Sequence, residues 1–508
     1  MKPRKTDLLV KGAVLAVVFV LASIWLLETE TSRVTAAGSK KGDWTQWGGS
    51  PDRNMVSDET GMPTTWDIKD GTNIEWVVPL GSQTYGNPVV HQGKILVGTN
   101  NNGEFRPAIK GDKGIVLCFD QKTGKLLWQA THDKLPTGRV NDWPEQGICS
   151  TALARGNRAY YVSNRAEVIC IDLDGFLDGE NDGPFTDETY KEKMDGDFVW
   201  VFDMIEEVAT FPHNLATCSP TADDKRLFVC TSNGVDEGHL NLPAPLAASF
   251  IALDLETGEL LWERDDPGKS ILHGQWSSPA YGVIGGQPMV VFAGGDGWCY
   301  AFKPEDGELL WKFDLNPKKS VWVLGGKGTR NAIISTPVIY GDQVFLAVGQ
   351  DPEHGEGPGH LYCIDGTKRG DITTSGKVWH YGDDDYNRTI STVAIQDGLC
   401  YASDLSGFLH CLDVKTGKRI WMHDLFSAIW GSPYVVDGKV YLGNEDGYVL
   451  VFEHGREKKL LAENDMGNSV YTTPVASSGG LYVTNRRQLY SLRQGAKMAG
   501  ATEKAGGD

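Results

Sequence analysis

The sequence predicts an all-β protein: an eight-bladed β-propeller of four-stranded antiparallel blades, closed by an N-terminal strand and preceded by one N-terminal hydrophobic helix. Three observations predict it. Short strand patterns recur eight times, four repeats share a turn sequence that ends on Trp, and the chain contains 61 Gly and 16 Trp. Propeller blades are units of this kind, because each small sheet needs several turns and a large apolar anchor.

The first 37 residues are expected to be a signal peptide or a signal anchor rather than part of the fold. A basic start ("MKPRK") precedes an apolar stretch, which is typical of export signals. The "VTA" at 34–36 would serve as a cleavage site, whereas an uncleaved segment would anchor the chain in the inner membrane through residues 8–27. The sequence therefore predicts an exported protein of the periplasm or cell envelope. Both a cleaved signal peptide and an uncleaved anchor are compatible with it.

The two ends of the repeat region predict how the ring closes. After a linker and lead-in at 38–72, an isolated strand, "NIEWVVPL" (73–80), precedes the first repeat, and the last repeat stops one strand short at 493. Pairing the two would leave no exposed sheet edge. The propeller is thus expected to span 73–493, with a disordered tail at 494–508. Seven blades is the alternative if blade 2, whose link between strands 3 and 4 is swollen, is not a separate blade.

Each repeat opens with a small or polar pair, usually followed by Pro, and continues with a period-2 apolar run, a turn and a third strand. The eight openings are "GNPVV" (86–90), "CSTAL" (149–153), "CSPTA" (218–222), "SSPAY" (277–281), "STPVI" (335–339), "STVAI" (391–395), "GSPYV" (431–435) and "TTPVA" (472–476).

The string "ALDLETGELLW" (252–262) represents the shared turn. Asp and Thr side chains suit a tight turn, Gly tolerates positive φ there, and Trp supplies a large apolar side chain to the outer strand. Because the string returns at the same place in several blades, it predicts an architectural role rather than a cofactor site. The expected structural Trp residues are Trp76, Trp128, Trp262, Trp311 and Trp421.

Charge and cysteine content exclude some classes of function. The formal net charge is −19 and no basic stripe is present, so no nucleic-acid partner is expected. The nine Cys are scattered and odd in number, and the absence of a CxxCH sequence excludes covalent attachment of haem. Cys218 and Cys230, which flank a predicted hairpin, are the best candidates for a disulfide.

The repeat resembles that of the pyrroloquinoline-quinone (PQQ) dehydrogenases, whose motif is Ala-x-Asp-x-x-Thr-Gly-Lys-x-x-Trp. "ALDLETGELLW" differs from it only by Glu259 in place of Lys, and the likeness covers residues 73–493. The same propeller is used by the outer-membrane assembly factor BamB, a scaffold without a quinone. The stretches "TSNGVDEGHLNLPAP" and "GQDPEHGEGPGHL" are similar to a planctomycete-type branch of this superfamily.

The resemblance implies two functions. One is a scaffold of the cell envelope that binds a ligand, a protein or a polymer. The alternative is a PQQ-dependent alcohol or sugar dehydrogenase, with PQQ and a divalent cation such as Ca²⁺ at the mouth of the central channel. Those enzymes commonly stack the quinone on a disulfide between adjacent Cys residues, and this sequence has no such pair, which favours the scaffold.

The segments that lead into strand 1 of each blade are expected to lie on the same face as the turns between strands 2 and 3. Propellers usually bind ligands at one end of the channel, so polar and aromatic residues there are candidate ligand-binding residues. For any one of them, hydrogen bonding to loop carbonyls is the alternative. The candidates are His213, Asn214, His273, Gln275, Trp276, Arg330, Asn331, Arg388 and Trp430.

Blades 1, 3 and 5 carry long loops between strands 2 and 3, at 99–114, 232–247 and 349–360, and long loops on a compact scaffold are often functional. Two of them combine carboxylates with His, which predicts either a divalent metal site or an ion-pair network. The candidate metal ligands are Asp236, Glu237, His239, Asp351, Glu353, His354 and His360.

Overall fold

The computed structural model describes residues 42–349, 354–355 and 357–498. The expected leader with its residues 8–27, the candidate ligands Asp351 and Glu353, and residues 499–508 lie outside the described part. Within that part, no helix has the length and apolarity that a membrane crossing requires.

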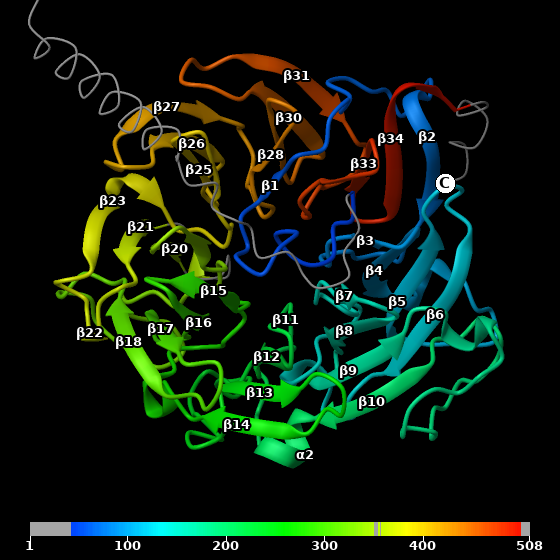
Figure 1. The fold of residues 1–508 in the computed structure, drawn as a ribbon, viewed down its shortest axis with the longest axis horizontal. Coiled ribbons are helices and arrows are strands. Elements are labelled where there is room, and N and C mark those ends of the chain that lie inside the picture. The colour runs from blue at the N-terminus through cyan, green and yellow to red at the C-terminus, as the bar shows by residue number, and fades with distance from the viewer. Residues whose placement is uncertain (1–41, 350–353, 356, 499–508) are drawn as a thin grey trace, which may run out of the picture. The chain divides into compact units, whose positions relative to one another are not determined.

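The described residues form eight sheets around one central axis (Figure 1), and each sheet contains four neighbouring antiparallel strands. This confirms the eight-bladed propeller, and blade 2 is a complete sheet, which excludes the seven-bladed alternative. Within the described residues there is little helix: α2 (Met204–Val208) follows blade 2, and 3-10 turns lie at Asn101–Gly103, Gly138–Val140, Gly175–Leu177 and Gly268–Ser270.

In blades 1 to 4 the strands follow one another along the chain from the inner to the outer edge of each sheet. Blade 1 contains β3 (Val89–His91), β4 (Lys94–Asn100), β5 (Lys113–Asp120) and β6 (Leu126–Asp133). Blade 2 contains β7 (Leu153–Arg155), β8 (Arg158–Val162), β9 (Glu167–Asp172) and β10 (Phe198–Asp203). Blade 3 contains β11 (Thr221–Ala222), β12 (Arg226–Cys230), β13 (Phe250–Asp254) and β14 (Leu260–Arg264). Blade 4 contains β15 (Ala280–Ile284), β16 (Gln287–Ala293), β17 (Trp298–Phe302) and β18 (Leu309–Asp314), with the short β22 (Gly370–Asp371) on its outer edge.

Blades 5 to 8 complete the ring. Blade 5 contains β19 (Val338–Tyr340), β20 (Gln343–Val348), β21 (Pro358–Asp365) and β23 (Lys377–Asn387). Blade 6 contains β24 (Ala394–Gln396), β25 (Leu399–Ser403), β26 (Phe408–Asp413) and β27 (Arg419–Asp424). Blade 7 contains β28 (Tyr434–Val436), β29 (Lys439–Gly443), β30 (Tyr448–Glu453) and β31 (Leu460–Asp465), and β1 (Val56–Ser57) pairs with β28. Blade 8 contains β32 (Val475–Ser477), β33 (Gly480–Thr484), β34 (Gln488–Lys497) and, from the N-terminal side, β2 (Thr72–Pro79).

The repeated Asp…Thr-Gly string forms the turn between strands 3 and 4. In blade 3 the Asp254 carboxylate accepts hydrogen bonds from the backbone N–H and the hydroxyl of Thr257, at 2.9 and 3.2 Å, and Gly258 has a φ of +76°. The side-chain bonds stabilise the turn, and Gly adopts the left-handed conformation without the strain that a Cβ would add.

The Trp at the end of the string packs on the turn of the following blade. A Cβ added at Gly307 would lie 2.9 Å from the ring of Trp262, and the Trp262 Nε1 donates to the Pro304 carbonyl at 2.8 Å. Trp200 packs in the same way on Gly258, and Trp379 on Gly417. The string therefore joins neighbouring blades. Trp200 and Trp379 are additional members of the set, which the motif misses because insertions separate them from their turns.

The ring closes through β2 and β34, as the ends of the repeat region predict. The two strands pair antiparallel, with Trp76 opposite Ser491. β34 is longer than the sequence predicts, because it continues to Lys497. Near its end, Gly495 donates its backbone N–H to the Asn73 side chain at 2.7 Å. Residues 494–497 thus belong to the sheet, not to a disordered tail.

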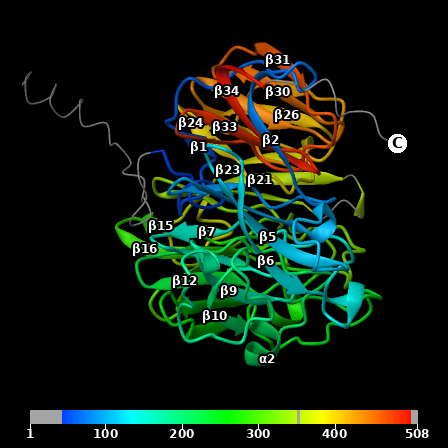
Figure 2. The same ribbon diagram turned by 90° about the vertical axis from the view of Figure 1, so that its right-hand side faces the viewer.

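The lead-in before β2 is an ordered part of the propeller rather than a linker. Residues 43–57 cross the centre of the ring in Figure 1 and lie along one side in Figure 2, next to the inner strands. Their backbone bonds to the inner strands of blades 1, 2, 4 and 7: Trp44 with Val90, Thr45 with Ala154, Pro51 with Tyr281, and Met55 with Val435. The inner strands have few partners at the axis, and the lead-in satisfies their backbone groups there.

The cysteines are all free thiols, which corrects the expectation of a disulfide. Cys218 and Cys230 are neighbours as expected, but the Cys218 Sγ accepts a hydrogen bond from the Cys230 backbone N–H at 3.2 Å. Burial raises the pKa of the Cys218 thiol to about 12, so the sulfur is held as the neutral, poorly nucleophilic form.

Candidate functional site

The segments that lead into strand 1 surround a pocket of about 480 Å³. All blades except blade 8 contribute to it, together with Trp47 of the lead-in. We call it the channel pocket. Its described lining residues are Trp47, Tyr85, Trp143, Gln146, Cys149, Thr151, Asn214, Leu215, Thr217, Ser219, His273, Trp276, Ser278, Ile334, Thr336, Ile390 and Trp430. None of them is Lys, Arg, Asp or Glu.

The floor of the channel pocket is fixed by a buried arginine. The Arg53 guanidinium is fully buried and donates to the carbonyls of Pro279, Ser219 and Trp47 at 2.7–2.8 Å. Burial lowers the pKa of Arg53 to about 9, because the charged form loses its hydration. The guanidinium thus joins the lead-in to blades 3 and 4 beneath the pocket, and its N–H groups are directed at the backbone.

Aromatic rings form a large part of the pocket wall. Tyr85 stacks on Tyr471 with ring centroids 5.2 Å apart, and Trp430 meets Tyr471 edge-on at 5.1 Å. Glu445 orients two of these rings, because its carboxylate accepts from the Tyr471 hydroxyl at 3.2 Å and from Trp430 Nε1 at 3.4 Å. Rings held in this way present fixed apolar faces.

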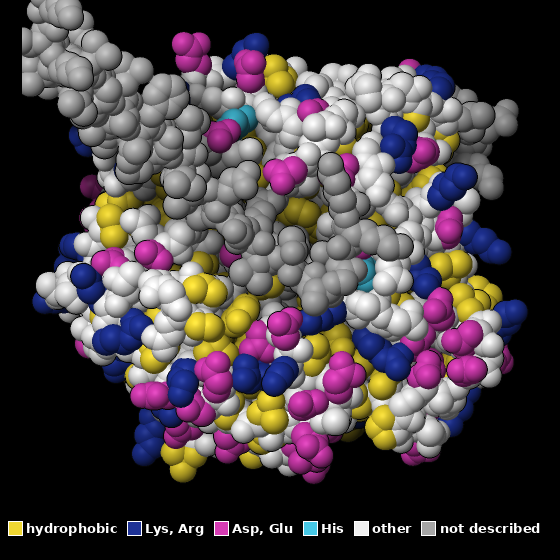
Figure 3. Space-filling model, in the orientation of Figure 1, with side chains coloured by type: hydrophobic (Ala, Val, Ile, Leu, Met, Phe, Trp, Pro, Cys, Tyr) yellow, Lys and Arg dark blue, Asp and Glu magenta, His cyan; other side chains and the backbone are white. Residues whose placement is uncertain are grey.

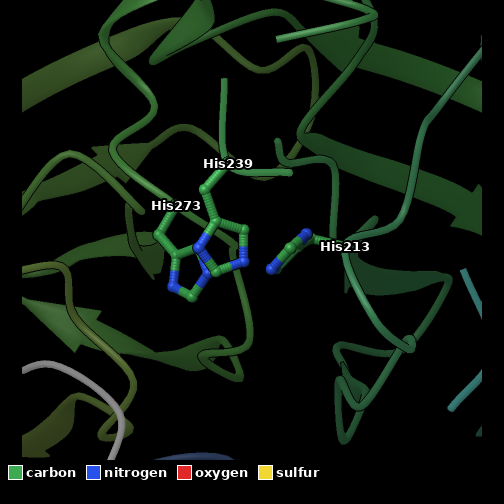
Figure 4. Close-up of side chains that lie close together, drawn as sticks. All are labelled: His213, His239 and His273. Carbon is green, nitrogen blue, oxygen red and sulfur yellow. The ribbon is translucent and has the colours of Figure 1, made fainter. Parts of the chain in front are cut away.

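Next to the pocket lies a cluster of three histidines, His213, His239 and His273 (Figure 4). Their rings point toward one another, and one ligand nitrogen from each lies within 4.8 Å of the other two. The Nε2 atoms of His239 and His273 are 3.3 Å apart. His213 and His273 are buried, whereas His239 is half-buried. His273 also lines the channel pocket, so the cluster and the pocket are adjacent.

Three segments far apart in the chain position these rings. His213 leads into blade 3, His239 lies in the long loop between β12 and β13, and His273 leads into blade 4. Val235 joins two of them, because its carbonyl accepts from His213 Nδ1 at 2.8 Å and its N–H donates to the His273 carbonyl at 2.9 Å. Since a carbonyl only accepts, His213 carries a proton on Nδ1, so that in the neutral ring Nε2 is the nitrogen with the lone pair.

Three of the other candidate metal ligands, Asp236, Glu237 and His360, have partners away from this cluster. The Asp236 carboxylate bonds within its own loop, to Leu240 and Asn241, and Glu237 forms an ion pair with Arg139 at 3.3 Å. His360 pairs with His380 at 3.0 Å, and burial lowers its pKa to about 4.

His354 is adjacent to the cluster. Its ring lies 4.8 Å from that of His273, and its Nε2 lies 3.0 Å from the Gly325 carbonyl. Of the proposed metal ligands that the structure describes, His239 lies with the histidines of the channel mouth, and His354 lies beside them.

The comparisons with known proteins agree with this fold. The family described as outer membrane protein assembly factor BamB matches residues 189–383 and 359–459, together more than half of the chain. The chain belongs to this family. BamB of Yersinia pestis is 22% identical over 389 residues, which cover 75% of this chain and 71% of that protein. A polyvinylalcohol dehydrogenase of a Pseudomonas species is 22% identical over 431 residues, covering 77% of this chain and 62% of the enzyme.

Solved structures show the same fold at low identity. BamB from Moraxella catarrhalis superposes on this BamB-family chain with a TM-score of 0.55 at 12% identity, covering 82% of this chain and 99% of that one. A europium-containing methanol dehydrogenase superposes with a TM-score of 0.60 at 13% identity, covering 89% of this chain and 98% of that one. The propeller fold is therefore common to BamB and to a dehydrogenase, so the fold alone does not indicate the function, which has to be inferred from the residues of the site. The planctomycete-type branch stays a prediction.

In this BamB-family propeller, the remaining channel-mouth candidates divide into two groups. Asn214, Trp276 and Trp430 line the channel pocket with His273. Arg330, Asn331, Arg388 and Gln275 do not. Two of Arg330's nitrogens bond the Asp314 carboxylate at 2.7 and 3.2 Å. Arg388 donates to Asn331 Oδ1 and to the His354 carbonyl.

Gln275 is also occupied within the protein. It is buried, and its Nε2 donates to the Ser249 hydroxyl at 2.8 Å. These four side chains therefore brace loops of the BamB-family propeller, as the alternative interpretation held for single residues.

The sequence prediction missed several pocket residues. Tyr85 and Trp143 occupy the segments that lead into blades 1 and 2, and the rule that found His213 and Trp276 would have found them if applied to every blade. Trp47 and Arg53 had no such signal, because they lie in the lead-in, outside the repeats of the BamB-family fold.

Proposed function

We propose that this BamB-family chain is a binding propeller of the cell envelope, and that the channel pocket holds a neutral, hydroxyl-rich ligand such as a saccharide or a polyalcohol segment. The observation that carries the proposal is the composition of the pocket. Five aromatic residues line it together with Gln146, Asn214 and five Ser or Thr residues, and its described lining has no Lys, Arg, Asp or Glu.

This composition matches the chemistry of such ligands. Aromatic faces pack against the apolar C–H faces of a sugar ring or a polyalcohol chain, while amide and hydroxyl side chains pair with its hydroxyl groups. A charged ligand would lose hydration in the pocket without gaining an opposite charge. The relative named polyvinylalcohol dehydrogenase supports the ligand class, and the relatives named as BamB support a place in the envelope.

A PQQ-dependent dehydrogenase fits the residues less well. PQQ carries three carboxylates, but the two arginines among the channel-mouth candidates have partners within the protein: Arg330 bonds to Asp314, and Arg388 to the His354 carbonyl. Ca²⁺ takes six or more oxygen ligands, often carboxylates, and none of the described pocket residues is acidic. We therefore derive no reaction through PQQ at this site.

The test is a titration of the full chain followed by tryptophan fluorescence and calorimetry. Neutral mono- and disaccharides, short poly(vinyl alcohol) oligomers and PQQ would be compared. We expect saturable binding of a neutral compound, weakened by about 10-fold or more in Trp276→Ala or Trp430→Ala, because each removes a large contact face. Trp322→Ala, which removes an exposed Trp that does not line the pocket, should leave the affinity unchanged.

Two outcomes would overturn the proposal. Saturable binding of PQQ, lost in the same two variants, would identify a quinone site instead. Absence of binding by every neutral compound would mean that the pocket is a packed end of the channel.

A further inference from the structure

We propose that His213, His239 and His273 form a binding site for a divalent transition metal ion, of which zinc is the most suitable, at the edge of the channel pocket. The proposal is independent of what the pocket itself binds. It rests on the distances between the rings, on the way the backbone fixes them and on the chemistry of their nitrogen atoms.

The distances suit a shared ion. Two nitrogen ligands at about 2.0–2.1 Å from a tetrahedral zinc ion lie about 3.3–3.4 Å from each other. The Nε2 atoms of His239 and His273 are 3.3 Å apart, and the ligand nitrogens of all three rings lie within 4.8 Å of one another. A small movement of one ring is enough to bring the third nitrogen to the same spacing.

The backbone orients the rings as metal ligands are usually oriented. His213 donates from Nδ1 to the Val235 carbonyl at 2.8 Å, which fixes both the ring and the tautomer with a lone pair on Nε2. Metal-binding histidines commonly donate their other nitrogen to a carbonyl in this way. Val235 also bonds the His273 carbonyl, so one residue holds two of the three ligands in place.

Two glycines allow the three segments to approach each other. A Cβ at Gly234 would lie 2.7 Å from the His213 Cβ and 2.6 Å from the His273 carbonyl oxygen. A Cβ at Gly325 would lie 2.7 Å from both the Cβ and the carbonyl oxygen of His239. Contacts this short are not tolerated, so the close packing around the rings depends on Gly at both positions.

The donor set selects the class of metal. Three neutral imidazoles suit zinc, copper, nickel or iron, whereas Ca²⁺ and Mg²⁺ require oxygen ligands. The three described imidazoles would occupy three of the four positions of a tetrahedral zinc ion. Because His273 lines the channel pocket, a ligand in that pocket would lie beside the ion.

The experiment uses the full chain without a histidine tag, stripped of metal with a chelator. Zn²⁺ binding is measured by calorimetry, and Co²⁺ binding by its visible absorption, which reports the ligand geometry. We expect one ion per chain. His213→Ala and His239→Ala should each weaken zinc binding by more than about 100-fold. Mutation of residues that merely orient metal ligands already lowers metal affinity by about 10- to 100-fold, and these two variants remove a ligand itself.

Further variants separate loss of the site from loss of the fold. Gly325→Ala keeps all three ligands but displaces His239, and should weaken binding by about 10-fold or more. His380→Ala removes a member of the other close histidine pair, 3.0 Å from His360, and should leave zinc affinity unchanged. Circular dichroism and thermal unfolding verify that each variant is folded.

The proposal fails if the parent protein binds Zn²⁺ no more tightly than a folded His213→Ala/His239→Ala double variant. It also fails if His380→Ala weakens binding as much as His239→Ala does. Displacement of Zn²⁺ by equimolar Ca²⁺ would contradict the argument from the nitrogen donors.

Discussion

The indole ring of Trp262 packs on Gly307, which belongs to the turn of the next blade. A Cβ at this glycine would lie 2.9 Å from the ring, and the φ of +70° is already unfavourable for other residues. The contact explains why the turn sequence and the Trp occur together: they are the two halves of a joint between consecutive blades. Its disruption should affect the whole ring rather than one hairpin.

We expect Gly307→Ala to lower the free energy of unfolding by about 1–3 kcal/mol, because it adds both backbone strain and a clash. Gly286→Ala is the matched control. Gly286 has a φ of +79° but no neighbour within 4 Å of an added Cβ, so it reports strain alone. Urea unfolding of both variants measures the difference, and equal losses would mean that the packing of Trp262 on this glycine contributes nothing.

The buried Asp296 should make stability depend on pH. Burial raises its pKa to about 7, although the Tyr300 hydroxyl donates to it at 2.8 Å. In the unfolded chain this carboxyl ionises near its ordinary pKa of 3.8, so between the two pKa values the native state keeps a proton that the unfolded chain has lost. Stability should therefore fall as the pH rises from about 4 to 7.

Asp296→Asn should remove this dependence, raising stability above that of the parent at about pH 8 and leaving the two closer near pH 4. Asp446 occupies the equivalent turn of blade 7 and is exposed, so Asp446→Asn is the control. Chemical unfolding across this range measures both. An unchanged pH profile in Asp296→Asn would contradict the prediction.

Arg53 should be a major contributor to the stability of the lead-in. Arg53→Met leaves the carbonyls of Pro279 and Ser219 without their charged donor, and we expect a loss of about 3–5 kcal/mol, as when other buried ionic networks are broken. Arg456→Met is the control, because Arg456 is exposed and paired with Asp413. It should lower the free energy of unfolding by less than about 1 kcal/mol. Similar losses at both positions would show that Arg53 is dispensable.

Cys149 should be the cysteine that a maleimide labels in the folded protein, because the other eight are buried. Burial raises its pKa to about 12, so the reaction should be slow at neutral pH and faster as the pH rises. Since Cys149 lines the channel pocket, a bound ligand should protect it. Mass spectrometry after digestion locates the label. Faster labelling of any other cysteine in the native protein would contradict this assignment.

The sequence predicted the parts of the fold that repeat. Strands of period 2 and the Asp…Thr-Gly…Trp string identify the blades, since each copy obeys the same local rules of turn and packing. The lead-in could not be predicted in this way. Arg53 bonds to residues more than 160 positions away, and a single buried arginine among surface-like neighbours gives no periodic signal.

The sequence predicted which face of the propeller carries the candidate site, but not the contacts between the side chains there. The position of segments before strand 1 correctly placed His273, Trp276 and Trp430 at the pocket, because propeller topology fixes which loops share a face. It could not show that Arg330 turns toward Asp314, or that His239 approaches His273. Those contacts depend on loop conformations, which single residues do not determine.

The distribution of surface charge could not be predicted from the net charge either. On the face viewed in Figure 3, acidic and basic side chains are interspersed.

Closure of the ring by β2 and β34 has a consequence for synthesis. Ser491 and Glu75 bond to each other across a separation of 416 positions, so the eighth blade forms only after nearly the whole chain has been made. Until then β2 presents an unpaired edge that can pair with the wrong strand or with another nascent chain. Contacts of such long range also form slowly. Protection of this one strand during translation should therefore determine the yield of folded protein more than the stability of any single blade does.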